Sequence, residues 1–336
     1  MNKWRNQKDS FQQALRYIKG RKDGSITCFK TPWERMNDAT TGGLEWGSTT
    51  VIAGRPGTGK TLIKDQIIRE GIKLNCTVAE YESGKFPFRV LEFQLEMIGR
   101  VSALREFTSI VNKSYKELCS VNEDISEEVI KRCYEYSKKR VGYPIDLIDE
   151  ACTVTEFTKI IESYLNTHAK IDSNGVRTYV NTIVTLDHTL LLKKGKTEKD
   201  KMEILYNLGE AVTSLKKRFP IAFILLSQLN RNVDSAERNE DGKYGNYILD
   251  SDIFGADAVL QHADTVIGLN RPGKKKIRFY GPDRFIIDNE NILAAHFLKC
   301  RNGDTRISFF EAQYAQMKIK EIPPPPTNAR NGNRNS

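Results

Sequence analysis

The chain has 336 residues, of which 39% are hydrophobic and 28% charged, and its formal net charge is +9. This length and apolar content suit one large domain with appendages or two modest ones, and they exclude a chain too polar to build a core. A basic excess of this size fits a polyanionic partner, although many basic proteins have none.

Neither a membrane protein nor a disulfide-stabilised protein is indicated. The longest apolar run, residues 221–226, is far too short to span a bilayer, and the start MNKWRNQKDS has no apolar signal-peptide core. The six cysteines include no C-x-x-C pair, which argues against structural zinc and a disulfide framework. We therefore expect a soluble protein of the cytoplasm with no membrane partner.

Residues 1–30 precede the first strand pattern and are predicted to form an N-terminal helix and a linker. Phe11, Leu15 and Ile18 repeat at helical spacing and give this helix one apolar stripe. A stripe on a helix outside the core needs a partner, which is either the chain's own core or a neighbouring subunit.

The phosphate-binding pattern G-x-x-x-x-G-K-[ST] occurs at residues 54–61, GRPGTGKT, between a strand pattern and a helical pattern. Glycines allow backbone N–H groups to point at phosphate oxygens, and the helix adds its positive N-terminal end. We expect Lys60 to reach the β- and γ-phosphates and the Thr61 hydroxyl to bind Mg²⁺. The residues assigned to the nucleotide here are Gly54, Arg55, Pro56, Gly57, Thr58, Gly59, Lys60 and Thr61.

Strands and helices alternate along the chain. Strand patterns occur at 76–81, 144–149, 178–187, 221–228, 265–270, 276–280, 292–299 and 305–311. Helical patterns cover 87–140, 156–168 and 202–219, with predicted loops at 193–201 and 231–247. We therefore predict an α/β fold over 31–318, with a mostly parallel twisted sheet, helices on both faces and β-rich C-terminal additions. Residues 319–336 are predicted to be a disordered tail.

Polar residues that close predicted strands are candidates for catalysis, because ligands bind at the carboxyl ends of parallel strands. Asp187 closes an apolar strand and would hold the Mg²⁺ shell. Glu82 follows another strand and is the candidate general base, with Glu80 on the same face as its rival. Gln228 ends a third strand and would sense the γ-phosphate. Each of these side chains has the alternative of being a solvated strand cap.

The order of the motifs resembles that of the DnaB-like replicative helicases. The resemblance covers about residues 31–314 and is carried by GRPGTGKT, the strand-ending Glu82, TIVTLDH, LLSQLNR, DSDIFGADAVLQHADTVIGLNR and LKCRNGDT. LDH at 186–188 and LKCRNGDT at 298–305 look most similar to the phage primase–helicase branch of a family that also includes mitochondrial Twinkle.

The resemblance implies a RecA-like ATPase core that works as a ring, usually a hexamer, around single-stranded DNA. By position, the family's catalytic roles fall on Lys60, Thr61, Glu82 (catalytic glutamate), Asp187 (Walker B acid) and Gln228 (γ-phosphate sensor). Lys299 and Arg301 match the basic pair that the family inserts into the next subunit's site, and Arg271 matches a residue that lies against the nucleotide base.

The family's DNA-binding loop usually carries an Arg–Glu or Arg–Gly pair where this chain has Phe254 and Gly255. Contact with the strand must then come from backbone N–H groups, stacking of Phe254 or nearby basic residues. The candidates are Lys193, Lys194, Lys196, Arg231, Lys243, Phe254 and Gly255. Each lysine has the alternative of being a solvated surface charge.

Two stretches depart from the family pattern. The interval from Glu82 to Asp187 is longer than expected, so the helices near 105–140 are interpreted as an insertion that docks a partner or serves as padding. The run Lys274-Lys275-Lys276, in a basic hairpin near 271–284, has the same two alternatives.

We therefore predict an ATP-dependent (or other NTP-dependent), Mg²⁺-requiring replicative-type helicase that forms a ring and hydrolyses nucleotide between its subunits. A primase, polymerase or loader is an expected further partner, and a phage-encoded origin is suggested by the resemblance alone. Two alternatives stay open. One is a RecA-type recombination ATPase that forms filaments, and the other is a helicase-like scaffold or loader that binds nucleotide but barely hydrolyses it.

Overall fold

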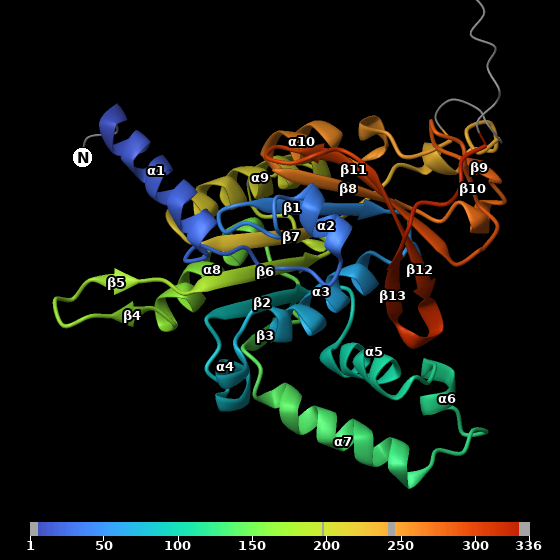
Figure 1. Cartoon of the computed structure of the whole chain (residues 1–336), viewed down its shortest axis with the longest axis horizontal. Helices are drawn as coiled ribbons and strands as arrows, with labels where there is room; N and C mark the ends of the chain where they lie inside the picture. The colour runs from blue at the N-terminus through green and yellow to red at the C-terminus, as the bar shows by residue number, and fades with distance from the viewer. Residues whose placement is uncertain (1–5, 197, 241–245, 329–336) are drawn as a thin grey trace, which may run out of the picture.

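The computed structural model describes residues 6–196, 198–240 and 246–328, and its centre is one nine-stranded mixed sheet (Figure 1). The sheet strands are β1 Thr49–Gly54, β2 Phe88–Gln94, β3 Ile145–Ile148, β6 Asn181–Asp187, β7 Ile221–Gln228, β8 Thr265–Asn270, β11 Ile292–Cys300, β12 Ile307–Gln313 and β13 Lys318–Ile322. Their order is β13-β12-β11-β8-β1-β7-β6-β2-β3. The strands from β8 to β3 are parallel, and β11, β12 and β13 extend the sheet in antiparallel fashion.

Helices occupy the connections between strands, and two small hairpins lie outside the sheet. The α-helices are α1 Gln7–Asp23, α2 Glu34–Ala39, α3 Lys60–Leu74, α4 Val78–Ser83, α5 Gly99–Val111, α6 Tyr115–Cys119, α7 Glu127–Val141, α8 Val154–Thr167, α9 Lys201–Arg218 and α10 Ala256–His262. The 3-10 turns are η1 Thr189–Leu191, η2 Arg231–Asp234, η3 Asp250–Asp252, η4 Gly273–Lys275 and η5 Tyr314–Gln316. The hairpins pair β4 Lys170–Ile171 with β5 Arg177–Thr178, and β9 Phe279–Tyr280 with β10 Phe285–Ile286.

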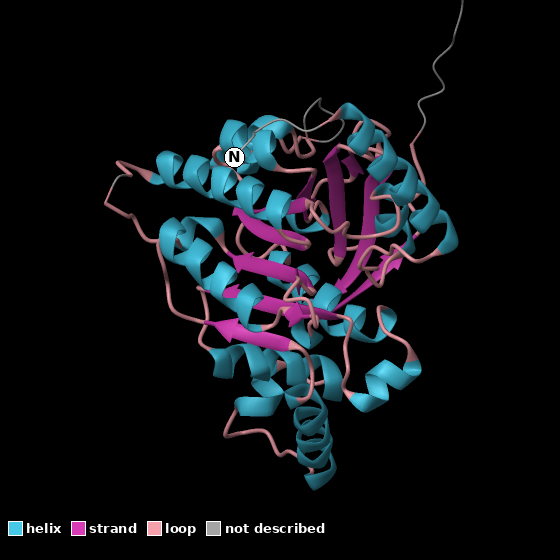
Figure 2. Cartoon of the chain, turned by 90° about the vertical axis from the view of Figure 1, so that its left-hand side faces the viewer, coloured by secondary structure: helices cyan, strands magenta, loops and turns pink. Residues whose placement is uncertain are grey.

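Both faces of the sheet are buried, as Figure 2 shows from the helices on either side of it. On β7, Phe223 and Leu225 face the layer that contains α8 and α9, whereas Ile224 and Leu226 face the layer that contains α3. Parallel strands covered on both faces are near-continuous apolar runs, which is why the first seven residues of β7 are all buried. The carboxyl ends of the parallel strands therefore meet along one edge, where β1 opens into the phosphate loop.

The predicted α/β sheet is confirmed, and the strands predicted at 221–228 and 265–270 coincide with β7 and β8. The strand predicted at 76–81 is wrong, because these residues lead into the helix α4. Thr77 caps that helix through a capping box, in which the Glu80 carboxylate accepts from Thr77 N at 2.8 Å and Thr77 Oγ1 accepts from Glu80 N. The T-x-x-E signal of a helix start therefore outweighs the β-propensity of this stretch.

Other element boundaries also differ from the predictions. The helical pattern predicted over 87–140 is interrupted, because β2 occupies its first part before α5, α6 and α7 begin. The tail predicted from 319 begins too early, since Lys318–Ile322 pairs with β12 as β13. Residues 329–336 of the predicted tail lie outside the described residues. In the part of the chain that the structure describes, no helix combines the length and the apolar character needed to cross a bilayer.

Candidate active site

The phosphate loop joins the end of β1 to the start of α3. Gly57 and Gly59 have φ values of 75° and 103°, which residues with a side chain rarely adopt. Lys60 begins α3, and its Nζ donates to the carbonyl oxygens of Gly54 and Arg55 at 2.9 and 3.3 Å. Burial lowers the pKa of this ammonium group. A curled glycine loop with a cation at its centre and a helix N-terminus behind it fits a polyphosphate.

Thr61 and Asp187 have the chemistry of a magnesium site. Thr61 Oγ1 donates to Asp187 Oδ2 at 2.7 Å, which joins α3 to the end of β6. Asp187 is 1% exposed, and its Oδ1 has no hydrogen-bond partner among the residues that the structure describes. A buried carboxylate oxygen without a partner is costly unless a cation or its waters complete it. A hydroxyl and a carboxylate suit Mg²⁺, which prefers oxygen ligands and usually shares its shell with water and phosphate.

A cavity of about 640 Å³ opens beside the phosphate loop. Lys60, Thr61 and Gln228 line it on the sheet side, as the sequence predicts. Arg105 of α5 and Lys116 of α6 line its other side. The sequence pattern indicates an insertion that docks a partner or serves as padding at these helices. In the structure they form part of the wall of the cavity.

His188 also lines the cavity and is a residue that sequence reasoning missed. Gln228 Nε2 lies 3.3 Å from His188 Nε2, at the ends of β7 and β6. An amide nitrogen only donates, so the ring nitrogen accepts and the imidazole is neutral. Burial lowers the pKa of His188, in agreement with a neutral ring. The available signal in the sequence was its position directly after Asp187.

Glu82, the predicted general base, lies away from this cavity. It belongs to α4, which precedes β2 and so lies at the amino ends of the parallel strands, opposite the phosphate loop. Glu80, its rival, is engaged in the capping box of the same helix. The glutamate that lines the cavity is Glu96, two residues past the end of β2. Since Gln94 pairs in register with Asp187 on β6, Glu96 emerges directly beside the magnesium site.

Arg271 follows the end of β8 and lines a second pocket beside the phosphate loop, whereas its neighbour Tyr314 lines the cavity of about 640 Å³. Its guanidinium carbon lies 3.8 Å from the ring centroid of Tyr314, and its Nη1 donates to Gly57 O at 3.4 Å. The Tyr314 hydroxyl donates to Thr58 O at 3.3 Å. This stacked pair is held against the phosphate loop, which suits the contact with a nucleotide base that the family resemblance implies for Arg271.

Lys299 and Arg301 lie at the amino ends of the parallel strands, opposite the phosphate loop. β11 runs antiparallel to β8 and ends beside the start of β8, whereas the phosphate loop is level with its far end. Six strand residues separate these ends by roughly 20 Å. Arg301 Nη1 lies 3.5 Å from Asp264 Oδ1, and its side chain is 56% exposed. Lys299 Nζ donates to Leu260 O. Neither side chain reaches the phosphate loop of its own chain.

The predicted DNA loops follow β6 and β7. The exposed basic candidates are Lys193, Lys194, Lys196 and Arg231. Phe254 N donates to Gln228 O at 2.9 Å, so the loop 229–253 leaves and returns at the end of β7. Gly255 has a φ of 68° and packs against α9, where an added Cβ would lie 2.6 Å from a side chain. Lys243 lies outside the described residues.

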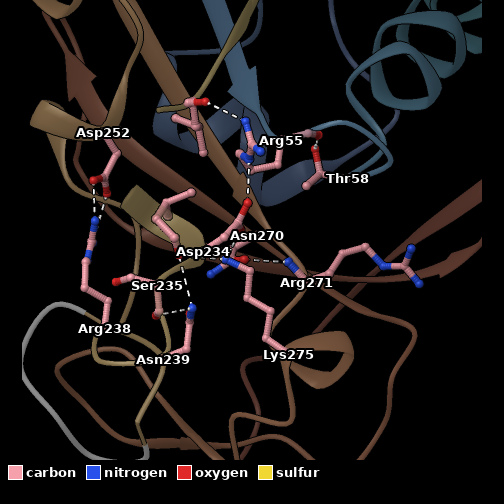
Figure 3. Close-up of polar contacts among 12 residues, drawn as sticks. Arg55, Thr58, Asp234, Ser235, Arg238, Asn239, Asp252, Asn270, Arg271 and Lys275 are labelled. Atoms are coloured by element: carbon pink, nitrogen blue, oxygen red, sulfur yellow. Dashed lines mark hydrogen bonds and ion pairs between the residues drawn. The ribbon is translucent and has the colours of Figure 1, made fainter. Parts of the chain in front are cut away.

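Two ion pairs meet at Asp234, one from the phosphate loop and one from the segment 273–275 (Figure 3). Arg55 Nε lies 2.6 Å from Asp234 Oδ2 in η2, and Lys275 Nζ of η4 lies 3.0 Å from Asp234 Oδ1. Arg55 Nη1 also donates to Leu229 O at 3.2 Å. The Asp234 carboxylate therefore connects the phosphate loop, the segment after β7 and the basic hairpin. Lys275 forms an ion pair within the chain at this point.

Comparison with known proteins identifies relatives over most of the chain. A family model described as the DnaB-like helicase C terminal domain matches residues 29–319. The replicative DNA helicase DnaB of Helicobacter pylori (strain ATCC 700392 / 26695) is 24% identical over 274 residues, which cover 80% of this chain and 49% of that protein. The replicative DNA helicase DnaB of Mycoplasma genitalium is 26% identical over 267 residues, 79% of this chain and 50% of that protein. The chain thus spans about half the length of these curated relatives.

Solved structures show the same fold. The ATPase domain of a helicase superposes with a TM-score of 0.72 at 16% identity, over 93% of this chain and 98% of that chain. A DnaB-like replicative helicase, described together with its interactions with primase, superposes with a TM-score of 0.67 at 16% identity, over 88% of this chain and 63% of that chain.

Proposed function

The chain belongs to the DnaB-like helicase C-terminal domain family, and from this premise we propose that it is the nucleotide-driven motor of a ring-forming replicative DNA helicase. It would bind ATP or another NTP with Mg²⁺ and move along single-stranded DNA as a homo-oligomer, which we expect to be a hexamer. A primase, a polymerase or a loader is the further partner expected of such a motor.

The observation that carries this proposal is the separation of Arg301 from the phosphate loop of its own chain. The groups suited to phosphate and magnesium gather at the carboxyl ends of the parallel strands, whereas Arg301 is exposed near their amino ends. An arginine supplied by a neighbour can neutralise the charge that develops on the transferred phosphoryl group. Hydrolysis would then require a neighbouring subunit, and Lys299 would accompany Arg301 into that site.

Within one subunit, each group has a distinct chemical task. Lys60 would bind the β- and γ-phosphates, and Thr61 and Asp187 would hold Mg²⁺, which neutralises charge on the phosphate oxygens. Glu96 replaces Glu82 as the proposed general base that accepts a proton from the attacking water. Gln228, oriented by neutral His188, would contact the γ-phosphate.

The backbone contact between Gln228 and Phe254 supports coupling of hydrolysis to DNA movement. Because Gln228 O accepts from Phe254 N, a shift of Gln228 on loss of the γ-phosphate would move both ends of the loop 229–253. Phe254 and the exposed Arg231 flank this loop and are the proposed DNA contacts there. Lys193, Lys194 and Lys196 are the proposed phosphate contacts of the neighbouring loop.

The test measures ATP hydrolysis with and without single-stranded DNA, unwinding of forked DNA, and particle mass with and without nucleotide. Closed rings that unwind forks are the expected result. Filaments that coat DNA without unwinding would identify a recombination ATPase instead, and rings without turnover would identify a scaffold or loader.

A mixing experiment tests the shared site directly. Lys60→Ala and Arg301→Ala subunits are each expected to be inactive alone, because each lacks one half of every site. Mixed rings are expected to regain part of the activity, because some interfaces then combine an intact Lys60 with a neighbour's intact Arg301. No recovery across all mixing ratios, in rings shown to contain both variants, would mean that Lys60 and Arg301 of the same subunit act together and would contradict the shared site.

A further inference from the structure

A chain of buried polar side chains runs beneath the phosphate loop. Lys64 on α3 has a fully buried side chain, and its Nζ lies 2.6 Å from Asp65 Oδ1 and 3.2 Å from Glu92 Oε1 on β2. Gln94 Nε2 donates to the other oxygen, Glu92 Oε2, at 3.3 Å. Glu92 and Gln94 are each 4% exposed. Replacing a buried ion pair with apolar residues is often neutral or stabilising, so stability alone does not explain this pair.

This chain fixes the orientation of the Gln94 amide. The Glu92 carboxylate, held by the Lys64 ammonium, only accepts hydrogen bonds, so the amide must turn its nitrogen toward Glu92. The amide oxygen Oε1 is thereby directed away from Glu92. This oxygen is buried, and no group in the described part of the chain is hydrogen-bonded to it. A buried acceptor without a hydrogen bond destabilises the fold unless a bound ligand or water donates one to it.

The position of Gln94 indicates which bound group would donate a hydrogen bond to its Oε1 atom. Gln94 and Asp187 are paired in register on adjacent parallel strands, so their side chains leave the same face of the sheet about 4.8 Å apart. Asp187 Oδ1 is another buried oxygen without a hydrogen-bond partner among the described residues, and Asp187 Oδ2 accepts from Thr61. Two unpartnered acceptors therefore lie side by side at the magnesium site.

We propose that Gln94 Oε1 accepts a hydrogen bond from a water of the magnesium shell, and that Lys64 and Glu92 position its amide for this task. Mg²⁺ usually keeps several of its waters when it binds with a nucleotide, and each of these waters is a donor. Asp187 and Gln94 would hold such waters from adjacent strands. This inference rests on the proposed nucleotide site, and it adds a residue that orients the shell without contacting the metal.

The test titrates magnesium into the full chain with a fluorescent, non-hydrolysable ATP analogue and no DNA, and it follows nucleotide binding. Gln94→Met is expected to raise the magnesium concentration at half-saturation about tenfold, as is typical for loss of an outer-sphere partner. Gln94→Asn, which keeps the amide but withdraws the oxygen by one methylene, is expected to raise it as well. Gln94→Asn also provides the test of the proposal if Gln94→Met fails to fold.

Gln66 provides a matched control. It is also 4% exposed, but both ends of its amide are satisfied by the backbone of Ile319, each at 2.8 Å. Gln66→Met is expected to lower the thermal unfolding midpoint while it leaves the magnesium midpoint unchanged. A joint change of Lys64 and Glu92 to Met and of Asp65 to Asn, which removes all three charges of this cluster, is expected to raise the magnesium midpoint by freeing the Gln94 amide.

The two proposals fail in different ways. A wild-type chain that binds no nucleotide in the presence of magnesium would overturn the proposed function and this inference together. Normal binding by the wild type, with the same magnesium midpoint in both Gln94 variants, would overturn only the role of Gln94. A raised midpoint in Gln66→Met equal to that in Gln94→Met would also overturn it, because the effect would then come from any lost buried amide.

Discussion

Arg55 Nε lies 2.6 Å from Asp234 Oδ2, so the phosphate loop is bound directly to the segment that follows β7. The two side chains are 24% and 40% exposed, and an ion pair with this much solvent contributes little to stability, on the order of 0–1 kcal/mol. Burial opposes the charged form, but hydrogen bonds from Arg55 and Lys275 hold the pKa of Asp234 below its usual value. A contact that adds little stability but joins the phosphate loop to the proposed DNA-binding loop suits a role in coupling hydrolysis to DNA binding.

Asp234→Ala is therefore expected to reduce the stimulation of hydrolysis by single-stranded DNA about fivefold, at the low end of typical coupling energies. The basal rate is expected to change little, because no catalytic group is removed. Glu162→Ala is the matched control, since Glu162 also pairs with an arginine, Arg218, at 2.6 Å but lies on α8, away from the phosphate loop. Equal losses of basal and stimulated rate in Asp234→Ala would contradict a coupling role.

Glu96→Gln is expected to lower kcat by about 10²–10⁴ while nucleotide binding is retained, as expected for removal of a general base. Glu82→Gln is the control, because Glu82 lies on α4 at the other end of the strands. Single-turnover hydrolysis in DNA-bound rings measures the chemical step directly. A loss of this size in Glu82→Gln, with normal turnover in Glu96→Gln, would reverse the assignment.

The phosphate loop and Asp187 could be predicted because their signals are local. GRPGTGKT lies between a clear strand and a clear helix, and Asp187 closes an apolar run that only a buried strand would carry. The same holds for Gln228, whose place at a strand end follows from the strand pattern, whereas Lys299 and Arg301 were singled out only by the resemblance to a known family. Such local patterns do not predict the order of the strands in the sheet.

Glu96 was missed because the residues before it do not look like a strand. Glu92 is a charge within β2 and breaks the apolar pattern, and its partner Lys64 is 28 residues away in the sequence. Only the folded chain shows that this charge is neutralised, so the local pattern favoured a helix there. In contrast, the capping box from Thr77 to Glu80 was a local signal for α4 that the strand prediction overlooked.

His296 gives a pH dependence of stability that does not involve the active site. It is buried, its Nε2 lies 2.7 Å from the Tyr280 hydroxyl, and burial lowers its pKa to about 3. The unfolded chain binds a proton on this ring below about pH 6.5, whereas the folded chain does so only near pH 3. The folded state therefore keeps its full stability above about pH 6.5 and loses it as pH falls toward 3.

His296→Gln removes this titration and keeps a polar side chain near Tyr280. Between about pH 6 and 4, the free energy of unfolding of the variant is expected to fall less steeply than that of the wild type, by up to about 1.4 kcal/mol per pH unit. Denaturant unfolding at several pH values measures both slopes, and the carboxylates that titrate in this range contribute equally to both. Identical slopes would show that His296 is accessible to protons in the folded state.

The apolar stripe of α1 predicts how subunits assemble. Phe11, Leu15 and Ile18 are 64%, 68% and 56% exposed on a helix that projects from the body of the molecule (Figure 1). Three large apolar side chains at helical spacing are costly in water, and a neighbouring subunit would bury them. Phe11→Glu together with Leu15→Glu is therefore expected to convert rings into smaller particles, measured by mass photometry, and to abolish hydrolysis that depends on a neighbour's Arg301.

The control for this change is Val121→Glu, which adds a charge at an apolar side chain that is 98% exposed between α6 and α7. This variant is expected to keep the particle mass and the hydrolysis rate of the wild type, because the position lies outside any helix and carries no stripe. In the α1 variant, nucleotide binding to the phosphate loop should persist at normal affinity, since Lys60 and Thr61 belong to the same subunit. Intact rings in the α1 variant would mean that the stripe has another partner and that contacts elsewhere on the core hold the subunits together.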